Sequence, residues 1–366
     1  MGDFTVGNAG SLEELSPWKR QWDDLAAAQE LPMLRYQWFA AAERHLAEPG
    51  SVRIVHVMDQ DQNLVAALPL QKTSDENGHT RYEILGQRRL YEPTDMLYRD
   101  DSARSRLLSA AASLGDPIML SRLWPSRSRA DAAAAIPAGR VRVRCHAIEL
   151  GKPSAPSQHV RLEGDYEAYS KTLPPRRRYD LRRAYRRAAD IGHLSIDFAT
   201  PGPEELHRGL DAAFEVEARS WKSARHTNVK ANPDLRAFFY QTLSSYATTH
   251  DVLVGLLSIE GEPAAAQVCL RAHRRIWILK IGYDDAFRRM SPGLILMNEL
   301  IHYGHDNGFL GIEFLGSAEG WLDAWRPEMR HYRLMALYPY TPRSLACLGG
   351  DIFALARRRT RPVNRV

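Results

Sequence analysis

The chain has 366 residues, which at the usual ~100–200 residues per domain corresponds to roughly two domains, each able to bury its own core. Hydrophobic residues make up 44% and charged residues 25%, a composition that excludes disordered, collagen-like and small disulfide-stapled chains. The net charge of +5 equals the contribution of the C-terminal arginines in RRRTRPVNRV, so the rest of the chain is formally neutral. A generally basic, nucleic-acid-seeking surface is therefore not expected.

The cysteines and the termini suggest where the protein works. Cys145, Cys269 and Cys347 are widely separated, without the close spacing of a zinc or redox site. His302 and His305 have a spacing that can hold a metal, but no third ligand accompanies them, so no metal centre is expected. The N-terminus lacks a secretory signal, and no uncharged stretch approaches the ~20 apolar residues of a membrane span. We expect a cytoplasmic protein with reduced thiols.

Two segments of the chain share one pattern. Residues 52–72 and 252–271 each predict a strand, a turn and a second strand, and Arg275–Tyr283 predicts a third strand after the second copy. Helices are predicted around both meanders, at 34–46, 102–114, 203–221, 233–246 and 292–307. The pattern indicates an α/β (α+β) chain with mixed sheets and a duplicated unit. The alternative is two unrelated hairpins that look alike.

An arginine-rich helix is predicted between the halves, at 171–190, after the turn-forming segment 151–158. Helical spacing places Arg178, Arg182 and Arg186 on one face. That face is either a solvated surface paired with nearby acids or a binding surface for a phosphate, a nucleic acid or an acidic head group. Nucleic acid is the least expected of these, because no aromatic stacking surface accompanies the arginines.

A phosphate site is predicted after the strand that ends near Tyr283. An arginine-bearing turn follows, and Pro292 and Gly293 begin the next helix. The free N–H groups and the positive dipole at such a helix start favour a phosphate or pyrophosphate. Arg288 and Arg289 can add charge-assisted hydrogen bonds, while Gly293 lets a ligand approach the backbone.

Several motifs over about residues 160–330 occur in an order that points to a family. They are the basic helix RRRYDLRRAYRRAADIG, Ser220-Trp221-Lys222, the hairpin at 260–265, Gly282-Tyr283-Asp284, Ser291-Pro292-Gly293 and Phe314-Leu315-Gly316. This order resembles the GNAT-type acyltransferases, in particular their CelD-like cellulose-biosynthesis branch, which is related to the Fem-type aminoacyl transferases. The resemblance implies two tandem GNAT-like units, with domains at 1–158 and 159–343 and an apolar, basic tail at 344–366. The N-terminal half matches only in pattern.

The resemblance also implies a binding site for an acyl-CoA co-substrate with an acetyl or longer chain. The expected coenzyme A contacts are Lys280, Gly282, Arg288, Arg289, Ser291 and Gly293. The glycine at 293 comes one place later than in the usual motif, and no second small residue follows it, a lateness that the CelD-like branch shares. Trp221 and Lys222 are expected to contact donor or acceptor. Where the branch has a Tyr-Lys pair followed by Trp, this chain has Trp321-Leu322 and then Trp325, and the missing lysine indicates a more apolar acceptor.

The implied reaction is aminolysis of a thioester, which needs a proton acceptor, an oxyanion donor and a proton donor to the thiolate. A backbone N–H near Lys280–Gly282 would hold the oxyanion. Asp284 and Glu313 are the candidate carboxylates, and Tyr283 is the candidate proton donor. In the alternative interpretation Asp284 only caps the turn and Glu313 is an exposed strand residue.

The acceptor is suggested by the apolar segment 334–356, which runs into the arginine tail. The segment suits either an anionic membrane surface or a final strand and docking helix. The expected function is N-acyl transfer to a primary amine in a ternary complex, the acceptor being a lipid amine such as a sphingoid base or an amino sugar. A peripheral position at the inner face of the membrane goes with the first acceptor. The alternatives are an aminoacyl-tRNA-dependent Fem-like transferase and a non-catalytic RNA- or anion-binding module.

Overall fold

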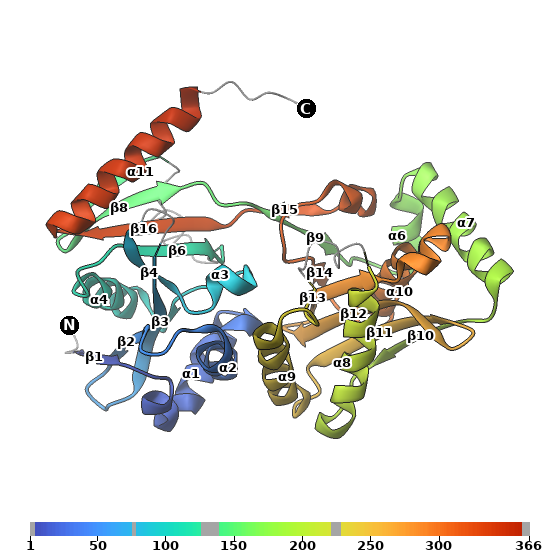
Figure 1. The fold of residues 1–366 in the computed structure, drawn as a ribbon, viewed down its shortest axis with the longest axis horizontal. Helices are drawn as coiled ribbons and strands as arrows, with labels where there is room; N and C mark the ends of the chain where they lie inside the picture. Colours follow the sequence, from blue (N-terminus) through green and yellow to red (C-terminus); the bar gives the residue numbers. More distant parts are fainter. Residues whose placement is uncertain (1–3, 75–77, 126–138, 221–227, 361–366) are drawn as a thin grey trace. The chain divides into compact units, whose positions relative to one another are not determined.

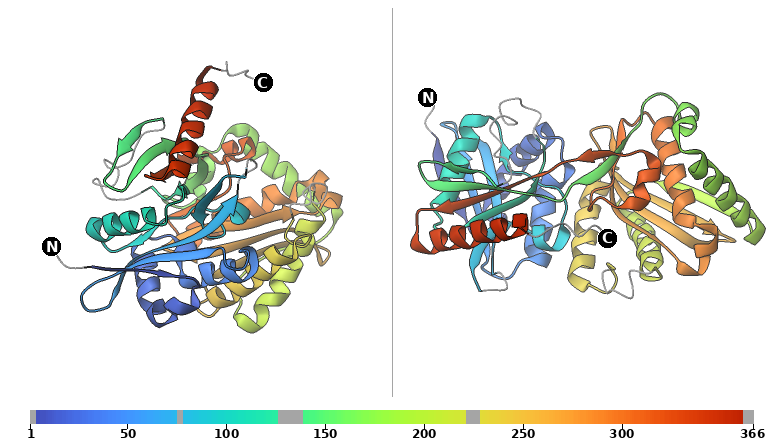
Figure 2. Two further views of the ribbon diagram at one scale, coloured as in Figure 1. Left: turned by 60° about the vertical axis from the view of Figure 1, so that its left-hand side comes forward. Right: turned by 90° about the horizontal axis from the view of Figure 1, so that it is seen from above.

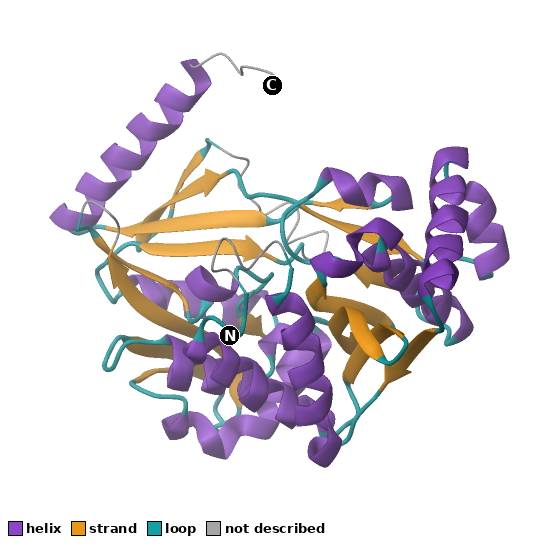
Figure 3. Cartoon of the chain, turned by 45° about the vertical axis from the view of Figure 1, so that its right-hand side comes forward, coloured by secondary structure: helices purple, strands orange, loops and turns teal. Residues whose placement is uncertain are grey.

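The computed structural model describes residues 4–74, 78–125, 139–220 and 228–360, with side chains to 357 (Figure 1). The chain divides into two units. Unit 1 combines Met1–Ala155 with His331–Val366, and unit 2 is Pro156–Arg330. Each unit is built on a mixed sheet with helices beside it (Figure 3). No helix within the described ranges is long and apolar enough to cross a membrane.

Unit 1 contains a nine-stranded sheet among its described residues. Its strands are β1 (Thr5–Ala9), β2 (Val52–Met58), β3 (Leu64–Ser74), β4 (Thr80–Ile84), β5 (Leu97–Tyr98), β6 (Ile118–Leu123), β7 (Val141–Val143), β8 (Ala147–Lys152) and β16 (Arg333–Pro339). They run in the order β1-β2-β3-β4-β6-β16-β8-β7, and β5 pairs with β3. The predicted strand-turn-strand at 52–72 is therefore confirmed as β2 and β3.

The helices of unit 1 enclose an apolar core rich in tryptophan, leucine and alanine. They are η1 (Glu13–Trp18), α1 (Lys19–Ala28), η2 (Pro32–Leu34), α2 (Tyr36–Leu46), α3 (Gln87–Leu90), α4 (Asp101–Ala112) and α11 (Pro342–Thr360). Helix α1 packs on β3, α4 packs on β2 and β3, and α11 packs on β16. The helices predicted at 34–46 and 102–114 are confirmed as α2 and α4, within two residues at each end.

Unit 2 contains a seven-stranded sheet among its described residues, in the order β10-β11-β12-β13-β14-β9-β15. Its strands are β9 (Ser157–Arg161), β10 (Leu194–Ala199), β11 (Val252–Ile259), β12 (Glu262–Ala272), β13 (Arg275–Tyr283), β14 (Gly311–Glu313) and β15 (Glu328–Arg330). Its helices are α6 (Tyr166–Thr172), α7 (Pro175–Ile191), α8 (Pro203–Ala218), α9 (Pro233–Ala247), η4 (Asp285–Met290), α10 (Pro292–Asp306) and η5 (Gly320–Trp325).

The two sheets repeat one topology, which confirms the duplicated unit. In unit 1 the strands β1 to β4 are antiparallel, β4 runs parallel to β6, and β6 pairs with antiparallel β16. In unit 2 the same pattern holds for β10 to β13, β14 and β9. The sixth strand of each sheet is exchanged along the chain, since β9 follows unit 1 in sequence and β16 follows unit 2.

This exchange changes the expected domain limits. Residues 331–343 were expected in the second domain, but β16 hydrogen-bonds to β6 and β8 of unit 1. The first limit, expected after residue 158, falls after Ala155 because β9 already belongs to the second sheet. The segment expected as a tail from 344 belongs, as far as residue 360, to helix α11, which begins at Pro342; residues 361–366 lie outside the described residues.

The sheet of unit 2 is covered by helices on both faces (Figure 2). On one face α10 packs on β11, β12 and β13, where Ile276 and Ile278 meet Met297 and Leu300 in one apolar cluster. On the other face α8 packs on β12 and β13. Burial of alternate strand residues against both layers explains why β11 and β12 read as nearly continuous apolar runs.

Candidate functional site

Strand β13 has an open edge in the middle of unit 2. It pairs with β14 only from Arg275 to Trp277, whereas its pairing with β12 continues to Tyr283. A register shift between Val268 and Cys269 leaves Leu279 as an extra residue in β13. Strand β14 ends at Glu313, the residue opposite Trp277, so beyond Trp277 β13 continues to Tyr283 paired with β12 alone among the described strands.

The open edge leads into the turn predicted to bind phosphate. Helix η4 carries Arg288 and Arg289 at the surface, and buried Met290 fixes it to the apolar core. Ser291 adopts a left-handed conformation with φ 56°, and Pro292 begins α10. The first turn of α10 contains no acidic residue, and no side chain caps it. This helix start therefore keeps its positive character.

The arginine-rich helix α7 lies against this turn. The guanidinium of Arg187 donates a hydrogen bond to the carbonyl oxygen of Arg289 at 2.8 Å. Ala184 and Ala188 pack in the same apolar cluster as Met290. The arginines of α7 with exposed side chains are Arg176, Arg182, Arg183, Arg186 and Arg187. The structure thus joins two positively charged features that the sequence analysis treated separately.

A partly buried polar network attaches α10 to α6 and α7. Tyr166 donates a hydrogen bond to Asn298 Oδ1 at 2.7 Å, Asn298 Nδ2 donates to the Tyr185 hydroxyl at 3.2 Å, and Tyr185 donates to Glu299. Burial raises the pKa of Tyr185 and of Tyr166. Sequence reasoning missed this network, although the tyrosine at 185 interrupts the arginine run on the helix face that packs inward.

Asp284, at the end of β13, makes two contacts with its carboxylate. Its carboxylate accepts a hydrogen bond from the N–H of Ala286 at 2.9 Å and lies 3.2 Å from the guanidinium of Arg219. Its side chain is largely buried. This geometry matches the alternative in which Asp284 caps the turn. Arg219 was not singled out from the sequence. It directly precedes the Ser220-Trp221-Lys222 triplet, in which Trp221 and Lys222 lie outside the described residues.

Glu313 is fully buried, contrary to the alternative of an exposed strand residue. Its carboxylate contacts Arg275 at 2.9 Å and Arg330 at 2.5 and 2.8 Å. Burial raises the pKa of Glu313, and the two guanidinium groups lower it in opposition. His159 stands opposite Glu313 on β9, and burial together with the nearby arginines lowers the pKa of His159 to about 4.

The residues expected to hold coenzyme A along β13 have other contacts. The ammonium of Lys280 lies 5.0 Å from the ring centroid of Phe239 on α9. A Cβ on Gly282 would lie 2.8 Å from the Cα of Glu217, so this glycine lets α8 approach the strand. A Cβ on Gly293 would meet only Tyr283 Cδ1, at 3.5 Å. Gly293 therefore has room on its outer side, whereas Gly282 has none.

The two tryptophans of η5 differ in environment. Trp325 is 1% exposed and packs in the core, with the guanidinium of Arg177 5.1 Å from its ring. Trp321 is 46% exposed and lies edge-on to Phe314, which follows β14. A substrate can therefore contact Trp321 but not the buried ring of Trp325.

The equivalent region of unit 1 is built differently. Helix α4 follows β4 as α10 follows β13, but its N-terminus is capped by Asp100, which accepts from Ala103 N–H at 2.9 Å. Asp101 adds a second acid in the first turn. The residues beyond β4 fill the space beside β6, where Thr94 bridges Leu123, and β5 pairs with β3. This helix start carries acids where the start of α10 carries none.

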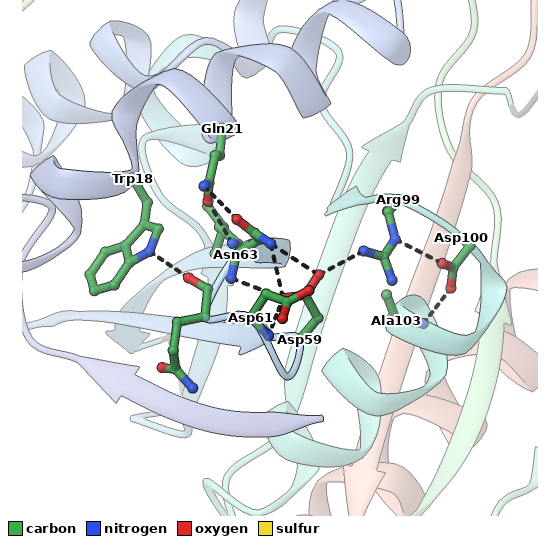
Figure 4. A network of polar contacts seen from close by, with 10 residues as sticks. Trp18, Gln21, Asp59, Asp61, Asn63, Arg99, Asp100 and Ala103 are labelled. Atoms are coloured by element: carbon green, nitrogen blue, oxygen red, sulfur yellow. Dashed lines mark hydrogen bonds and ion pairs between the residues drawn. The ribbon is translucent and has the colours of Figure 1, made fainter. Parts of the chain in front are cut away.

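A hollow of about 330 Å³ in unit 1 is lined by Gln21, Asp24, Leu25, Asp59, Asn63, Leu64, Val65 and Arg99. Figure 4 shows its polar rim. Asp59 accepts hydrogen bonds from the N–H groups of Asp61 and Asn63 and from Arg99 at 3.0 Å. These hydrogen bonds lower the pKa of Asp59, and the bond from the N–H of Asn63 has the largest effect. They connect the β2–β3 turn to the segment before α4. The polar rim therefore stabilises the β2–β3 hairpin.

Comparisons with known proteins agree with this geometry. Residues 175–323 match the family model described as an acetyltransferase (GNAT) domain. Unit 2 is thus a GNAT-type acyltransferase domain. The family match begins with α7 and ends within η5, so it includes the open edge of β13 and the turn before α10.

Solved structures share the fold of the whole chain. A structure of FemX is similar over 87% of this chain and 95% of its own, with a TM-score of 0.56 and 10% identity. The C-terminal domain (DUF2156) of a putative lysylphosphatidylglycerol synthetase from Agrobacterium fabrum is similar over 93% and 97%, with a TM-score of 0.54 and 12% identity. At these identities the likeness shows a common fold, related to that of Fem transferases. No curated protein sequence matches the chain.

No group of three or more histidine, cysteine or acidic side chains within the described ranges is arranged to hold a metal ion. His302 stacks on Tyr166 with ring centroids 4.2 Å apart, and His305 Nδ1 lies 3.1 Å from the carbonyl of Gly164. The two histidines thus help to hold α6 on α10.

Proposed function

We propose that unit 2 transfers an acyl group from acyl-CoA to a primary amine, by direct attack in a ternary complex. One observation carries the proposal: the open edge of β13 runs directly into a turn with two exposed arginines and an uncapped helix start. An extended thioester arm needs a strand edge, and a pyrophosphate needs positive charge with free N–H groups at its end. The equivalent region of unit 1 carries Asp100 and Asp101 instead.

In this proposal the donor lies with its pyrophosphate on Arg288, Arg289, Ser291 and Gly293. The arm follows β13 past Lys280 and Gly282. Gly293 leaves the backbone accessible, because a Cβ at this position would have only an ordinary contact behind it. We expect one donor per chain, since the acids at the start of α4 repel phosphate groups.

The chemistry proposed here is aminolysis. The amine nitrogen forms a bond to the thioester carbonyl carbon, the C–S bond breaks, and the amine proton leaves as the thiolate gains one. A backbone N–H of β13 near Lys280–Gly282 stabilises the oxyanion. The Tyr283 hydroxyl protonates the thiolate, and Asp284 accepts the amine proton through water. Glu313, enclosed by two guanidinium groups, is proposed as a positioning residue.

The acceptor proposed for this site is a lipid amine such as a sphingoid base, with an amino sugar as the other member of the class. Exposed Trp321 beside Phe314 supports an acceptor with an apolar part. Trp221 and Lys222 remain proposed contacts. A lipid acceptor would place the protein peripherally at the inner face of the membrane.

The test is a thiol-release assay with acetyl-, mid-chain and long-chain acyl-CoA against sphingoid bases and amino sugars. We expect turnover with at least one pair, one coenzyme A bound per chain by calorimetry, and loss of both in Arg288→Gln/Arg289→Gln. Arg176→Gln/Arg182→Gln, which removes two exposed arginines from α7, is the charge-matched control. Absence of turnover together with absence of coenzyme A binding would overturn the proposal.

A second candidate rests on helix α7, whose exposed arginines could hold a polyanion. In that case the donor is an aminoacyl-tRNA, and the same N-acyl transfer proceeds from an ester. Binding of tRNA that weakens steeply with salt, together with failure of coenzyme A to bind, would favour it over acyl-CoA.

A further inference from the structure

Helix α11 and strand β7 of unit 1 both expose large apolar side chains. The residues of this C-terminal apolar surface are Val141, Val143, Leu345, Ile352 and Phe353. Val143 is 72% exposed and Phe353 63% exposed. Val141 and Val143 pair with Leu150 and Ile148 of β8, so they emerge on the same sheet face as these two residues. Leu150 and Ile148 pack in the apolar cluster beneath α11.

The fold does not need this outer surface, because α11 already packs through another face. Leu348 and Leu355 contact the cluster formed by Leu150, Ala336 and Tyr338 on the sheet. Helical spacing places Leu345 and Ile352 beside this packed face, and Phe353 on the opposite side of the helix from Leu348 and Leu355. The helix therefore exposes apolar residues at the flank of its covered face and, with Phe353, on its outer side.

The charge around the surface is almost entirely positive. Residues 334–366 contain six arginines and one acid, Asp351. Asp351 is neutralised locally, because Lys152 lies 2.6 Å from its carboxylate and the Tyr338 hydroxyl donates to it. Arg357 lies one turn beyond Phe353, with its guanidinium 5.7 Å from the Phe353 ring. The sequence beyond Arg357 adds further arginines and no acid.

We propose that the C-terminal apolar surface binds an anionic lipid bilayer, with α11 lying in the plane of the interface. Ile352 and Phe353 enter the acyl boundary, and Arg357 contacts lipid phosphates. A bilayer fits better than a protein partner because the C-terminal segment that carries α11 has six arginines and one acid, which is itself paired with Lys152, and so offers few acids for a mixed protein interface. Anionic head groups supply the complementary charge.

The test measures co-sedimentation of the full chain with two kinds of vesicle, phosphatidylcholine alone and phosphatidylcholine mixed with phosphatidylglycerol. We expect binding to the mixed vesicles only, weakening as salt increases. Ile352→Ser/Phe353→Ser should lower the partition coefficient by about tenfold or more, and Arg357→Gln by about fivefold. Val6→Ser removes an equally exposed side chain at the opposite edge of the same sheet and should bind as the wild type does.

Equal binding to both kinds of vesicle, binding to neither, or an equal loss in Val6→Ser would overturn the proposal. A concentration-dependent dimer that Ile352→Ser/Phe353→Ser abolishes, without vesicle binding, would assign the surface to a second copy of the chain instead. Circular dichroism melting checks that the variants are folded. The bilayer is where a lipid acceptor of the proposed function would be found. The vesicle experiment requires no turnover, so failure to bind vesicles and failure to transfer an acyl group are separate results.

Discussion

The guanidinium of Arg187 hydrogen-bonds to the backbone carbonyl of Arg289 at 2.8 Å, which joins helix α7 to the turn before α10. The contact fixes the position of the turn and adds a positive charge beside Arg288 and Arg289. Arg183 lies one helical turn before Arg187 on the same side of α7. The arginine helix is thereby part of the proposed donor site.

Arg187→Gln should therefore weaken binding of the acyl-CoA donor without changing the rate of the chemical step. We expect KM for acyl-CoA to rise up to about fivefold with kcat nearly unchanged, because an exposed charge contributes modestly and equally to ground and transition states. Steady-state kinetics over a range of acyl-CoA concentrations measures both constants. Arg182→Gln, on the other flank of the helix, should leave KM unchanged. A fall in kcat alone would assign Arg187 to the chemistry and contradict its role as a positioning residue.

Gly282 and Gly293 should respond oppositely to alanine. A methyl at 282 would lie 2.8 Å from the Cα of Glu217, so Gly282→Ala must shift α8 or β13. We expect a loss of about 1–3 kcal/mol in the free energy of unfolding, measured by urea titration. Gly293→Ala should fold normally, since its methyl meets only Tyr283 at 3.5 Å.

Gly293→Ala then tests the phosphate site separately from stability. The added methyl stands at the first turn of α10, where the proposed pyrophosphate approaches the backbone. We expect KM for acyl-CoA to rise in this variant while its unfolding curve is unchanged. Unchanged KM would mean that the donor does not approach this helix start closely.

Glu313→Gln should lower stability rather than remove a catalytic base. The substitution leaves Arg275 and Arg330 partly buried without their shared carboxylate. The loss of one partner of a buried ion pair typically costs about 3 kcal/mol or more. Glu163→Gln, an exposed acid 80% accessible at its side chain, makes the same charge change and should cost less than about 0.5 kcal/mol. A Glu313→Gln variant of normal stability with no turnover would instead establish Glu313 as the base.

The local patterns of the sequence were sufficient for the order of elements and for the turn at Arg288 and Arg289, because strands and helices of ten or so residues carry clear periodicity. Strand β14 has three residues, too few for a period, so the burial of Glu313 was not visible. The contacts of Glu313 with Arg275 and Arg330 also come from distant segments, and a single sequence does not reveal which of its many arginines meet one acid.

The exchange of β9 and β16 was hidden for a related reason. Each of these strands lies next in sequence to one sheet and hydrogen-bonds in the other. Pairing of such strands depends on tertiary contacts rather than on local propensity. Trp321 and Trp325 illustrate the same limit, since both belong to η5 but only Trp325 meets the core beneath Arg177.

His159 should make stability depend on pH in a defined window. Burial, followed by the nearby Arg330 and Arg275, lowers the pKa of His159 from 6.5 to about 4, so the imidazole is neutral in the folded protein. Between pH 6.5 and about 4 the unfolded chain binds a proton that the folded chain does not. Stability from this group is thus complete above pH 6.5 and falls as the pH decreases, by about 3 kcal/mol at most.

His159→Asn removes the titrating group and should flatten this part of the profile. Urea unfolding of both proteins at a series of pH values between 4 and 7.5 measures it, and the difference between their free energies of unfolding should be constant above pH 6.5. Below that pH the wild type should lose stability faster, because the substitution leaves other titrating groups, including Glu313, in both proteins. If the free energies of unfolding of the two proteins stay parallel down to pH 4, His159 becomes protonated in the folded state. The arginines around Glu313 would then not exclude a charged imidazole at His159.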